Sequence, residues 1–429
     1  MRRMSANAVT KACLAGLCVL LGVAPASAGP GPKARADDVL LHHDDWWRRW
    51  IVVGIVTPDD SGVFSYTRDG YLPPQANTAF RVGSITKTFT ATLLALQNGT
   101  REMAVGSCPG KQGGGGRRAP LEPALAKACP TCGKKPKTAL LHKSRQGITI
   151  EQLATHRSGL AHKPTLPVCN TADLYATLTV LDVDTAAHKG CDTGTDPFAR
   201  EEIERQPGCQ ARYLCFAPDD RFNYSNWGYD LLGPLVAFNA GYGDDYNRLV
   251  RERLLLPLGM THTFSNDETP LPLGQIEKAP SWDCTSGPCQ SKVSSSDAET
   301  FHQHGSGNMW STGDDMLIYL RFVMGRLRLP TSAAALDATR TLVFCDRAQG
   351  ETGEDGTAAQ IGLAWNHEAI GATYDAANPG DLIWNKAGSA GDFHAYIAFS
   401  RKKGVGVFVL GNTSEDDPSK IGRTIIGGY

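Results

Sequence analysis

The stretch RVGSITKTFTATLLALQNGT, residues 81–100, holds a serine, Ser84, three residues before a lysine, Lys87. NG at 98–99 is a plausible helix end, and apolar residues precede it at helical spacing: Ile85, Phe89, Leu93 and Leu96. Residues three apart share a helix face, so Ser84 and Lys87 would lie side by side in the first turn. There the helix dipole favours developing negative charge, and a lysine of lowered pKa can take the hydroxyl proton. Two interpretations are open: a nucleophile with its base, or a serine that caps an ordinary helix.

Two later segments carry residue types that the same chemistry needs. FNYSNWGYDLLG (222–233) contains Tyr224, Ser225 and Asn226 just before a helix-like segment. IWNKAGSAGDF (383–393) contains Lys-Ala-Gly just before a predicted strand. Ser-x-x-Lys, then Tyr-x-Asn or Ser-x-Asn, then a Lys-[Thr/Ser]-Gly-like triplet is the ordered motif set of penicillin-binding proteins and β-lactamases. The order therefore favours the catalytic interpretation of the first motif.

With these motifs the sequence resembles the serine β-lactamase and DD-peptidase superfamily, specifically its class C-like branch, which also contains carboxypeptidases, endopeptidases and esterases. Further similar stretches follow in the family's order: LATHRSGL (153–160), PLGMTHTFS (257–265), GSGNMWSTGDDM (305–316) and IGLAWN (361–366). The resemblance spans roughly residues 50–412. It implies a β-lactamase/transpeptidase-like α+β fold, in which helices flank an antiparallel sheet built from both termini.

By resemblance, three residues would carry out the covalent chemistry. Ser84 would be the nucleophile that forms an acyl-enzyme, Lys87 would activate it, and Tyr224 would relay protons and help prepare the deacylating water. Tyrosine rather than serine at position 224 points to the class C-like branch, where no separate glutamate drives deacylation. Glu122, in EPALA (122–126), is accordingly interpreted as a surface residue.

The resemblance also implies a set of substrate-binding positions. Asn226 would hold the substrate amide, Lys386 would tune the tyrosine and attract an anionic substrate, and Gly388 belongs to the same triplet. The backbone N–H groups of Ser84 and Ser389 would form the oxyanion hole, which is often the largest single contribution to catalysis.

Ala387 departs from the family's pattern, because Thr or Ser is usual there and its hydroxyl helps to bind the substrate carboxylate. Alanine should weaken capture of a C-terminal carboxylate and leave the acylation machinery intact. The expected substrates are D-Ala-D-Ala-type peptidoglycan peptides, as for a DD-carboxypeptidase or endopeptidase, or β-lactams, which mimic them. Two alternatives stay open: a small-ester hydrolase of the same fold, and a catalytically silent cell-wall-binding protein.

Hydrophobic patterning predicts the same architecture. RWIVVGIVTPDDSGVFSYTRDG (49–70) and HAYIAFSRKKGVGVFVLGN (394–412) each show two β-rich runs around a turn, which predicts a hairpin near each end. Three segments between them repeat apolar residues at helical spacing: 226–241, 244–260 and 311–327. Strands at both ends with helices between them predict one α+β domain over 49–429, with a mostly helical lobe inserted at roughly 100–300.

The first 28 residues are predicted to be an export signal peptide. A basic start precedes the apolar core ACLAGLCVLLGVAP, and ASA at 26–28 offers small residues for cleavage. The apolar run is short for a membrane span, so no integral membrane segment is expected after signal removal. A lipoprotein is the competing interpretation, but Cys18 follows Leu17, where a small residue is expected. Residues 29–48 are predicted to be a tether, and the protein to be periplasmic or extracellular.

Export also accounts for the cysteines. The chain has 12, and loss of Cys13 and Cys18 with the signal peptide leaves 10, an even number that favours disulfides over metal ligands. Cys284 and Cys289 flank TSGP, a turn-like loop, and are predicted to pair. CPTC at 129–132 has no second CxxC, which favours a disulfide over a zinc or redox site.

Other classes of function are disfavoured. Lys and Arg total 43 against 44 Asp and Glu, and no basic run is long enough for nucleic acid, so no such partner is expected. CPGKQGGGGRRAP (108–120) lacks the Gly-Lys-Ser/Thr of a phosphate-binding loop. HHDD (42–45) is interpreted as a solvated edge rather than a metal cluster, and no cofactor or metal is expected. His156 and His394 are assigned to packing or to hydrogen bonds behind the site.

Overall fold

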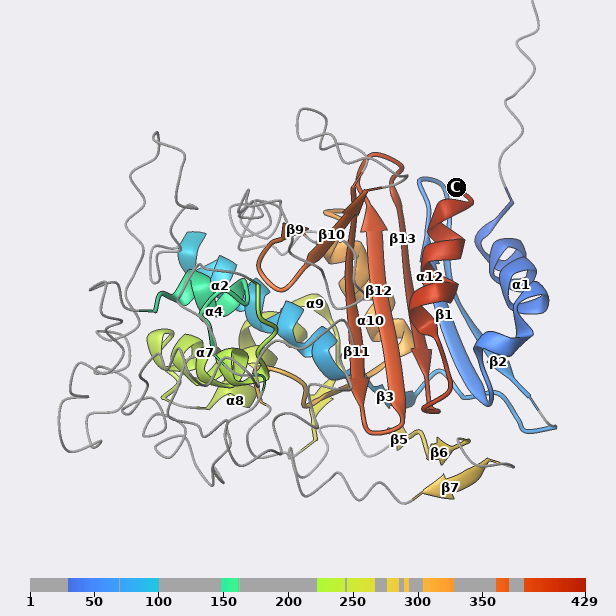
Figure 1. Cartoon of the computed structure of the whole chain (residues 1–429), viewed down its shortest axis with the longest axis horizontal. Coiled ribbons are helices and arrows are strands. Elements are labelled where there is room, and N and C mark those ends of the chain that lie inside the picture. Colours follow the sequence, from blue (N-terminus) through green and yellow to red (C-terminus); the bar gives the residue numbers. More distant parts are fainter. Residues whose placement is uncertain are drawn as a thin grey trace, which may run out of the picture.

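A seven-stranded antiparallel sheet forms the centre of the computed structural model (Figure 1), with strand order β2-β1-β13-β12-β11-β10-β9. Its strands are β1 (Trp50–Val56), β2 (Ser61–Thr67), β9 (Gln360–Ile361), β10 (Asn366–Ala369), β11 (Leu382–Ala390), β12 (Phe393–Ser400) and β13 (Val405–Gly411). The structure describes residues 30–68, 70–99, 148–160, 162, 222–243, 245–266, 276–284, 289–292, 304–327, 360–369 and 382–429. The predicted signal peptide, Glu122, CPTC and the glycine-rich 108–120 lie outside these residues.

Both ends of the chain build this sheet, as the patterning predicts. Strand β1 pairs with β2 on one side and with β13 on the other, where Ile51 lies opposite Gly411. The two expected hairpins, β1–β2 and β12–β13, are confirmed. The α+β architecture and the antiparallel sheet built from both termini are therefore correct.

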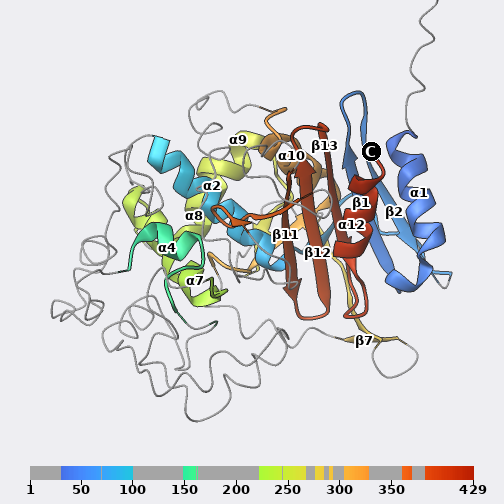
Figure 2. The same ribbon diagram turned by 45° about the horizontal axis from the view of Figure 1, so that its top comes forward.

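Two helices at the chain ends, α1 (Pro32–His42) and α12 (Pro418–Gly427), cover one face of the sheet (Figures 1 and 2). The tether predicted for 29–48 is wrong over α1, because Ala36, Val39 and Leu40 are buried in the cluster beneath these helices. Their spacing of three and four residues makes an apolar stripe that the Pro- and Gly-rich surroundings obscure. A short 3₁₀ helix, η1 (Asp44–Trp46), follows, and its two aspartates are exposed.

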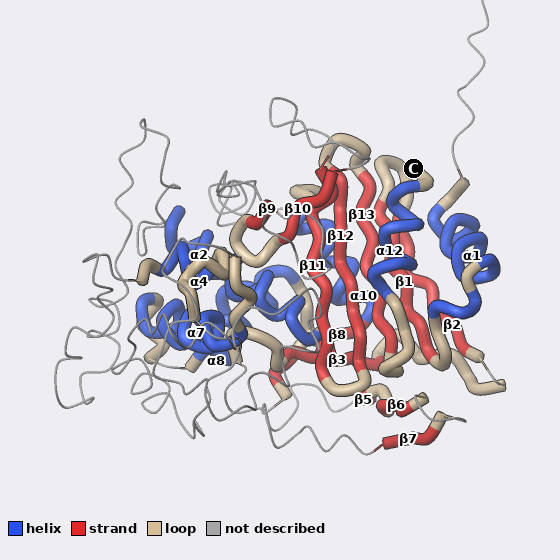
Figure 3. Tube along the Cα trace, viewed as in Figure 1, coloured by secondary structure: helices blue, strands red, loops and turns tan. Residues whose placement is uncertain are grey.

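The other face of the sheet packs on α10 (Gly313–Val323), beyond which the helices of the lobe are gathered (Figures 1 and 3). These helices are α2 (Thr86–Gly99), α4 (Ile150–Ala154), α7 (Asn226–Asn239), α8 (Tyr246–Val250), the π-helix η5 (Arg251–Leu255) and α9 (Leu256–Leu258). The helices expected over 226–241, 244–260 and 311–327 are all present. Among the described residues, no helix has the length and apolar character needed to cross a membrane.

Short strands form two smaller sheets beside the lobe. They are β3 (Thr78–Arg81), β4 (Phe264–Ser265), β5 (Glu277–Lys278) and β8 (Met309–Thr312) in one sheet, and β6 (Ser281–Asp283) and β7 (Gln290–Lys292) in the other. Cys284 and Cys289 form the predicted disulfide at the end of the β6–β7 pair. Trp282 of β6 donates its backbone N–H to the Asn412 carbonyl at 3.0 Å, which ties this pair to the end of β13.

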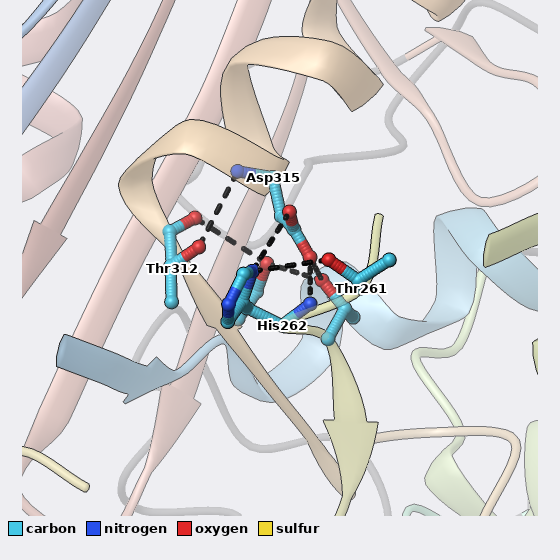
Figure 4. Close-up of polar contacts among 6 residues, drawn as sticks. Thr261, His262, Thr312 and Asp315 are labelled. Atoms are coloured by element: carbon cyan, nitrogen blue, oxygen red, sulfur yellow. Dashed lines mark hydrogen bonds and ion pairs between the residues drawn. The ribbon is translucent and has the colours of Figure 1, made fainter. Parts of the chain in front are cut away.

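A buried carboxylate joins the residues just before β4 to the start of α10 (Figure 4). Thr312 caps the helix, and Asp315 accepts hydrogen bonds from the His262 backbone N–H and the Thr263 hydroxyl, both at 2.8 Å. Thr263 also bonds the hydroxyl of Ser311 at 2.8 Å. Burial raises the pKa of the Asp315 carboxyl, and the two donors offset part of that effect. The cluster secures β8, the strand next to β3, which leads into the site.

Helix α2 is buried on all sides where its side chains are described, not only along the predicted apolar stripe. Its threonines are hydrogen-bonded within the core. Thr90 bonds the Gly305 carbonyl and the Tyr246 hydroxyl, each at 2.7 Å, and Thr88 accepts from the Tyr319 hydroxyl at 2.9 Å. A helix held by neighbours on every face has a fixed start, which matters because the turn that carries Ser84 runs directly into it.

Candidate active site

Ser84 lies in a 3₁₀ turn, η2 (Gly83–Ile85), that runs directly into α2. Val82 holds the N-cap position and makes no side-chain capping bond, so the interpretation of Ser84 as an ordinary cap is wrong. Lys87 follows one turn later, fully buried, with its Nζ 3.0 Å from the Ser84 Oγ. The pairing that the three-residue spacing predicts is therefore present.

The second motif enters from the start of α7. Ser225 is the N-cap of that helix, and its hydroxyl accepts the Gly228 backbone N–H at 2.9 Å. This cap orients the residues on either side of it. The Tyr224 hydroxyl donates to the Ser84 Oγ at 2.6 Å, and Asn226 Oδ1 accepts from Lys87 Nζ at 2.6 Å.

Lys87 Nζ has a third partner that the sequence does not single out. The backbone carbonyl of Ser306 accepts from it at 2.8 Å. Ser306 lies in GSGNMWSTGDDM (305–316), a stretch that resembles the family as a whole without marking this carbonyl. A backbone acceptor leaves no residue-type signature, so pattern reasoning has no means of finding it.

The third motif lies within strand β11 rather than just before a strand, which corrects the sequence prediction. Because side chains alternate across a strand, Lys386 lies on the lobe side and Ala387 on the side packed by the outer cluster. Lys386 is buried, and its Nζ lies 4.9 Å from the Tyr224 ring centroid. Lys87 Nζ lies 4.8 Å from the same centroid, so two amines flank one phenol.

Two glycines allow η2 to approach β11. Gly83 has φ +49°, and a β-carbon there would lie 2.6 Å from the backbone nitrogen of Ser389. A β-carbon at Gly388 would lie 2.1 Å from the Val82 carbonyl oxygen, two residues before Ser84. Strand β11 pairs with β10 only through Asn385, so from Lys386 onward its edge toward η2 carries no strand partner among the described residues. The backbones of Ser84 and Ser389 therefore border one open strand edge.

The His156 ring packs against the Tyr224 ring. His156 is fully buried, its ring centroid lies 4.4 Å from that of Tyr224, and its Nδ1 accepts the Ser225 backbone N–H at 3.1 Å. Burial, followed by the positive charges of Lys87 and Lys386, holds the pKa of His156 well below its ordinary value. Its expected role in packing and hydrogen bonding behind the site is confirmed.

His394, the other histidine assigned to packing, lies on β12 directly opposite Ser389. Burial lowers its pKa, and the nearby Asp417 opposes that effect. Sequence reasoning did not find His162, whose Nε2 lies 2.9 Å from Asn226 Nδ2. It follows LATHRSGL by two residues, but only the fold brings it to the start of α7.

The arrangement has the chemical groups that suit acyl transfer to a serine. The Ser84 hydroxyl contacts an amine, which can accept its proton when neutral, and a phenol, which can do so only as the phenolate. A second amine stands beside the phenol. All seven site residues named from the sequence lie on η2, α2, α7 or β11 or next to them. Within the described ranges, no three His, Cys, Asp or Glu side chains are grouped as metal ligands would be.

Comparisons with known proteins agree with this geometry. A family profile described as Beta-lactamase matches residues 46–426. A "Beta-lactamase" of Pseudomonas fluorescens is 25% identical over 396 residues, which cover 86% of this chain and 90% of that protein. The "D-alanyl-D-alanine-carboxypeptidase/endopeptidase AmpH" of Escherichia coli (strain K12) is 26% identical over 362 residues, 81% of this chain and 74% of that one.

Solved structures show the same fold. A class C β-lactamase in complex with cefoxitin has a TM-score of 0.62 at 20% identity, covering 92% of this chain and 98% of its own. The D-alanine carboxypeptidase AmpC from Burkholderia cenocepacia has a TM-score of 0.60 at 19% identity. The match covers 92% of this chain and 99% of that one. The β-lactamase/transpeptidase fold that the resemblance implies is thereby confirmed. Together with the profile match along most of its length, this shows that the chain belongs to the Beta-lactamase family.

Proposed function

We propose that this protein is a serine hydrolase that transfers an acyl group to Ser84 and then to water. One observation carries the proposal: the Ser84 Oγ is contacted at the same time by Lys87 Nζ at 3.0 Å and by the Tyr224 hydroxyl at 2.6 Å. A serine hydroxyl is a weak nucleophile until a neighbouring group takes its proton. Two such neighbours on one buried side of a half-buried serine are the arrangement that this step requires.

Lys87 is the proposed base. Two of its partners, Asn226 Oδ1 and the Ser306 carbonyl, are pure acceptors and engage two of its hydrogens. The third direction points to the Ser84 Oγ. When Lys87 is neutral, its lone pair occupies that direction and can accept the serine proton as the Oγ attacks the substrate carbonyl.

Tyr224 is the proposed acid and base for the second half of the reaction. Its hydroxyl can pass a proton to the leaving group and later take one from the attacking water. Lys87 and Lys386 flank its ring, and two positive charges stabilise negative charge on the phenolic oxygen. The proposed oxyanion hole is formed by the backbone N–H groups of Ser84 and Ser389 beside the open edge of β11.

The proposed substrates are D-Ala-D-Ala-type peptides of peptidoglycan or β-lactams. Support comes from the relatives named above, which are a β-lactamase and a carboxypeptidase/endopeptidase. Lys386, on the same strand edge, supplies a positive charge for an anionic group. Ala387 favours one alternative, a small-ester hydrolase, because the position offers no hydroxyl to a substrate carboxylate.

We also propose that the protein acts outside the cytoplasm. The support is the predicted signal peptide and the Cys284–Cys289 disulfide, since disulfides persist in oxidising compartments and are rare in the cytosol.

Labelling with a fluorescent penicillin tests the proposal. Purified protein is incubated with the reagent, separated by denaturing electrophoresis, and followed as the label is released. Rapid release indicates a β-lactamase and a persistent label a DD-peptidase. Absence of label from folded protein, with hydrolysis of p-nitrophenyl butyrate, indicates the esterase. Absence of both activities contradicts the proposal and leaves a silent binding protein.

A further inference from the structure

Asn226 connects the reacting groups to a histidine outside the three motifs. Its Oδ1 accepts from Lys87 Nζ at 2.6 Å, and its Nδ2 lies 2.9 Å from His162 Nε2. We propose that His162 is a positioning residue that holds the Asn226 amide in this orientation only while its imidazole is neutral, so that protonation of His162 impairs Lys87. The kinetic consequence rests on the proposed function, whereas the assigned protonation of His162 does not.

The hydrogen-bonding capacities of the three side chains assign the protons. Lys87 donates one N–H to Asn226 Oδ1 and another to the Ser306 carbonyl, which it can do both as an ammonium and as a neutral amine, so the oxygen of the Asn226 amide faces Lys87. The amide nitrogen, which is only a donor, then faces His162. Nε2 of His162 must accept this bond, and the single proton of the neutral imidazole lies on Nδ1.

Protonation of His162 is incompatible with this network. The imidazolium would direct an N–H from Nε2 at the Asn226 N–H, and the two donors would have no acceptor between them. If the pair separates, the amide loses the contact that orients it. If the amide rotates, its nitrogen faces Lys87 and can bond only the amine lone pair, the electron pair that would take the Ser84 proton. Either outcome lowers the rate of acylation.

The titratable groups around His162 are Tyr224 before α7, Lys87 of α2 and His156 after α4. The Tyr224 ring meets the His162 ring edge-on with centroids 5.5 Å apart, and Lys87 is reached through the amide. His156 lies behind Tyr224, and its pKa is held well below 6.5 by burial and by the charges of Lys87, Lys386 and His162. His156 therefore stays neutral where an ordinary imidazole titrates, near pH 6.5. Of these two histidines, His162 is therefore the one to which an acid limb is assigned.

Nuclear magnetic resonance of the full chain with ¹⁵N-labelled histidine tests the structural part. The variant His162→Gln identifies the signals of His162 by their loss. At pH 8 we expect a proton on Nδ1 and an unprotonated Nε2. A proton on Nε2 at that pH overturns the proposal, whether or not the protein hydrolyses anything. If the protein lacks activity, the proposed function fails and this measurement still decides the role of His162.

The pH dependence of kcat/KM tests the kinetic part, with p-nitrophenyl butyrate and a chromogenic cephalosporin as substrates. Below the midpoint of His162 protonation found by nuclear magnetic resonance, kcat/KM of the wild type should fall about tenfold per pH unit. Glutamine can accept the Asn226 bond through Oε1 without titrating, so His162→Gln should lack this limb. Its activity at pH 8 should stay within about tenfold of wild type, the size of one neutral hydrogen bond.

Two further variants complete the design. His162→Phe offers no acceptor and should be impaired at every pH. His262→Gln removes a histidine in the Asp315 cluster of Figure 4, away from the site, and should keep the wild-type acid limb. Circular dichroism at each pH verifies that all variants are folded. An acid limb that persists unchanged in His162→Gln contradicts the proposal.

Discussion

Gly388 approaches Val82 so closely that a β-carbon at 388 would lie 2.1 Å from the Val82 carbonyl oxygen and 3.2 Å from the Ile85 backbone nitrogen. Both neighbours are backbone atoms, which cannot move aside as a flexible side chain can. The contact joins β11 to the turn that carries Ser84. The distance between the nucleophile and the third motif is therefore set by a position that has no side chain.

Gly388→Ala should separate β11 from η2 and lower kcat/KM by about 100-fold, since a displacement of about 1 Å at a reacting centre has an effect of that size. Overpacking of this kind also reduces stability by about 1–3 kcal/mol. Kinetics and thermal unfolding measure the two effects. Gly427→Ala, at the end of α12 with open space around its β-carbon, is the matched control and should leave both unchanged. Wild-type activity in Gly388→Ala would contradict the rigid contact.

Ser84→Ala should abolish acyl-enzyme formation and leave the protein folded. The side chain is half-buried and contributes little packing, while the acyl group loses its only point of attachment to this motif. Intact-protein mass spectrometry after incubation with penicillin measures the adduct. Ser65→Ala, on an exposed position of β2, should label as wild type does. An adduct of undiminished yield in Ser84→Ala would show that another residue is the nucleophile.

Ala387→Thr should raise activity on carboxylate-bearing substrates more than on neutral esters. Position 387 is half-buried on β11, and alanine there has no donor for a carboxylate. Because its β-carbon lies on the face packed by the outer cluster, a threonine must direct its hydroxyl past the open edge of the strand to meet a substrate carboxylate. A hydrogen bond to a charged group contributes about 1.5–3 kcal/mol, which corresponds to roughly tenfold or more in kcat/KM. The measurement compares a D-Ala-D-Ala peptide or a cephalosporin with p-nitrophenyl butyrate in both proteins. Equal gains on both substrates would show that Ala387 does not limit carboxylate recognition.

Asp416, just after β13, should make stability depend on pH. It accepts the backbone N–H groups of Arg48 and Thr413 at 2.8 and 3.0 Å, and burial raises the pKa of its carboxyl to about 6. Because the folded-state pKa lies above the unfolded one, the contribution of Asp416 to stability is complete below about pH 4. It is lost as the pH rises through about 6.

Between pH 4 and pH 7, the unfolding free energy of wild type relative to Asp416→Asn should therefore fall by about 2 kcal/mol, because asparagine does not titrate. Urea unfolding at several pH values measures the difference. Glu415→Gln, which changes an exposed neighbour, provides the control. Its unfolding free energy should change with pH nearly as that of wild type does. If the unfolding free energies of Asp416→Asn and wild type change with pH in the same way, the Asp416 carboxyl has an ordinary pKa.

Much of the fold follows from local pattern. The hairpins at the two ends and the helices that begin at Asn226 and Gly313 show alternation or helical spacing bounded by turn and cap residues, and these are local properties. Helix α1 could not be found in this way. Its three buried apolar residues lie among charged ones and become a packed face only against the sheet and α12.

The candidate site divides in the same manner. Ser84, Lys87, Tyr224 and Lys386 carry functional groups at recognisable spacings, so ordered motifs suffice to name them. The Ser306 carbonyl and His162 have no such mark, because each acts through a contact between segments far apart in the sequence. The position of the third motif inside β11, rather than ahead of a strand, is likewise a consequence of pairing with β12.

The pairing of β1 with β13 joins Ile51 to Gly411, 360 positions later (411 − 51). During translation β1 is synthesised early, but the strand that pairs with its other edge, β13, is synthesised only when almost the whole chain has been translated. Ser84 likewise precedes Lys386 by 302 positions (386 − 84). A chain that stops before β11 therefore lacks the site and also exposes an unpaired, apolar strand edge, which is a template for aggregation. A chain truncated before β11, by premature termination or by proteolysis, therefore both lacks activity and becomes a substrate for chaperones and proteases.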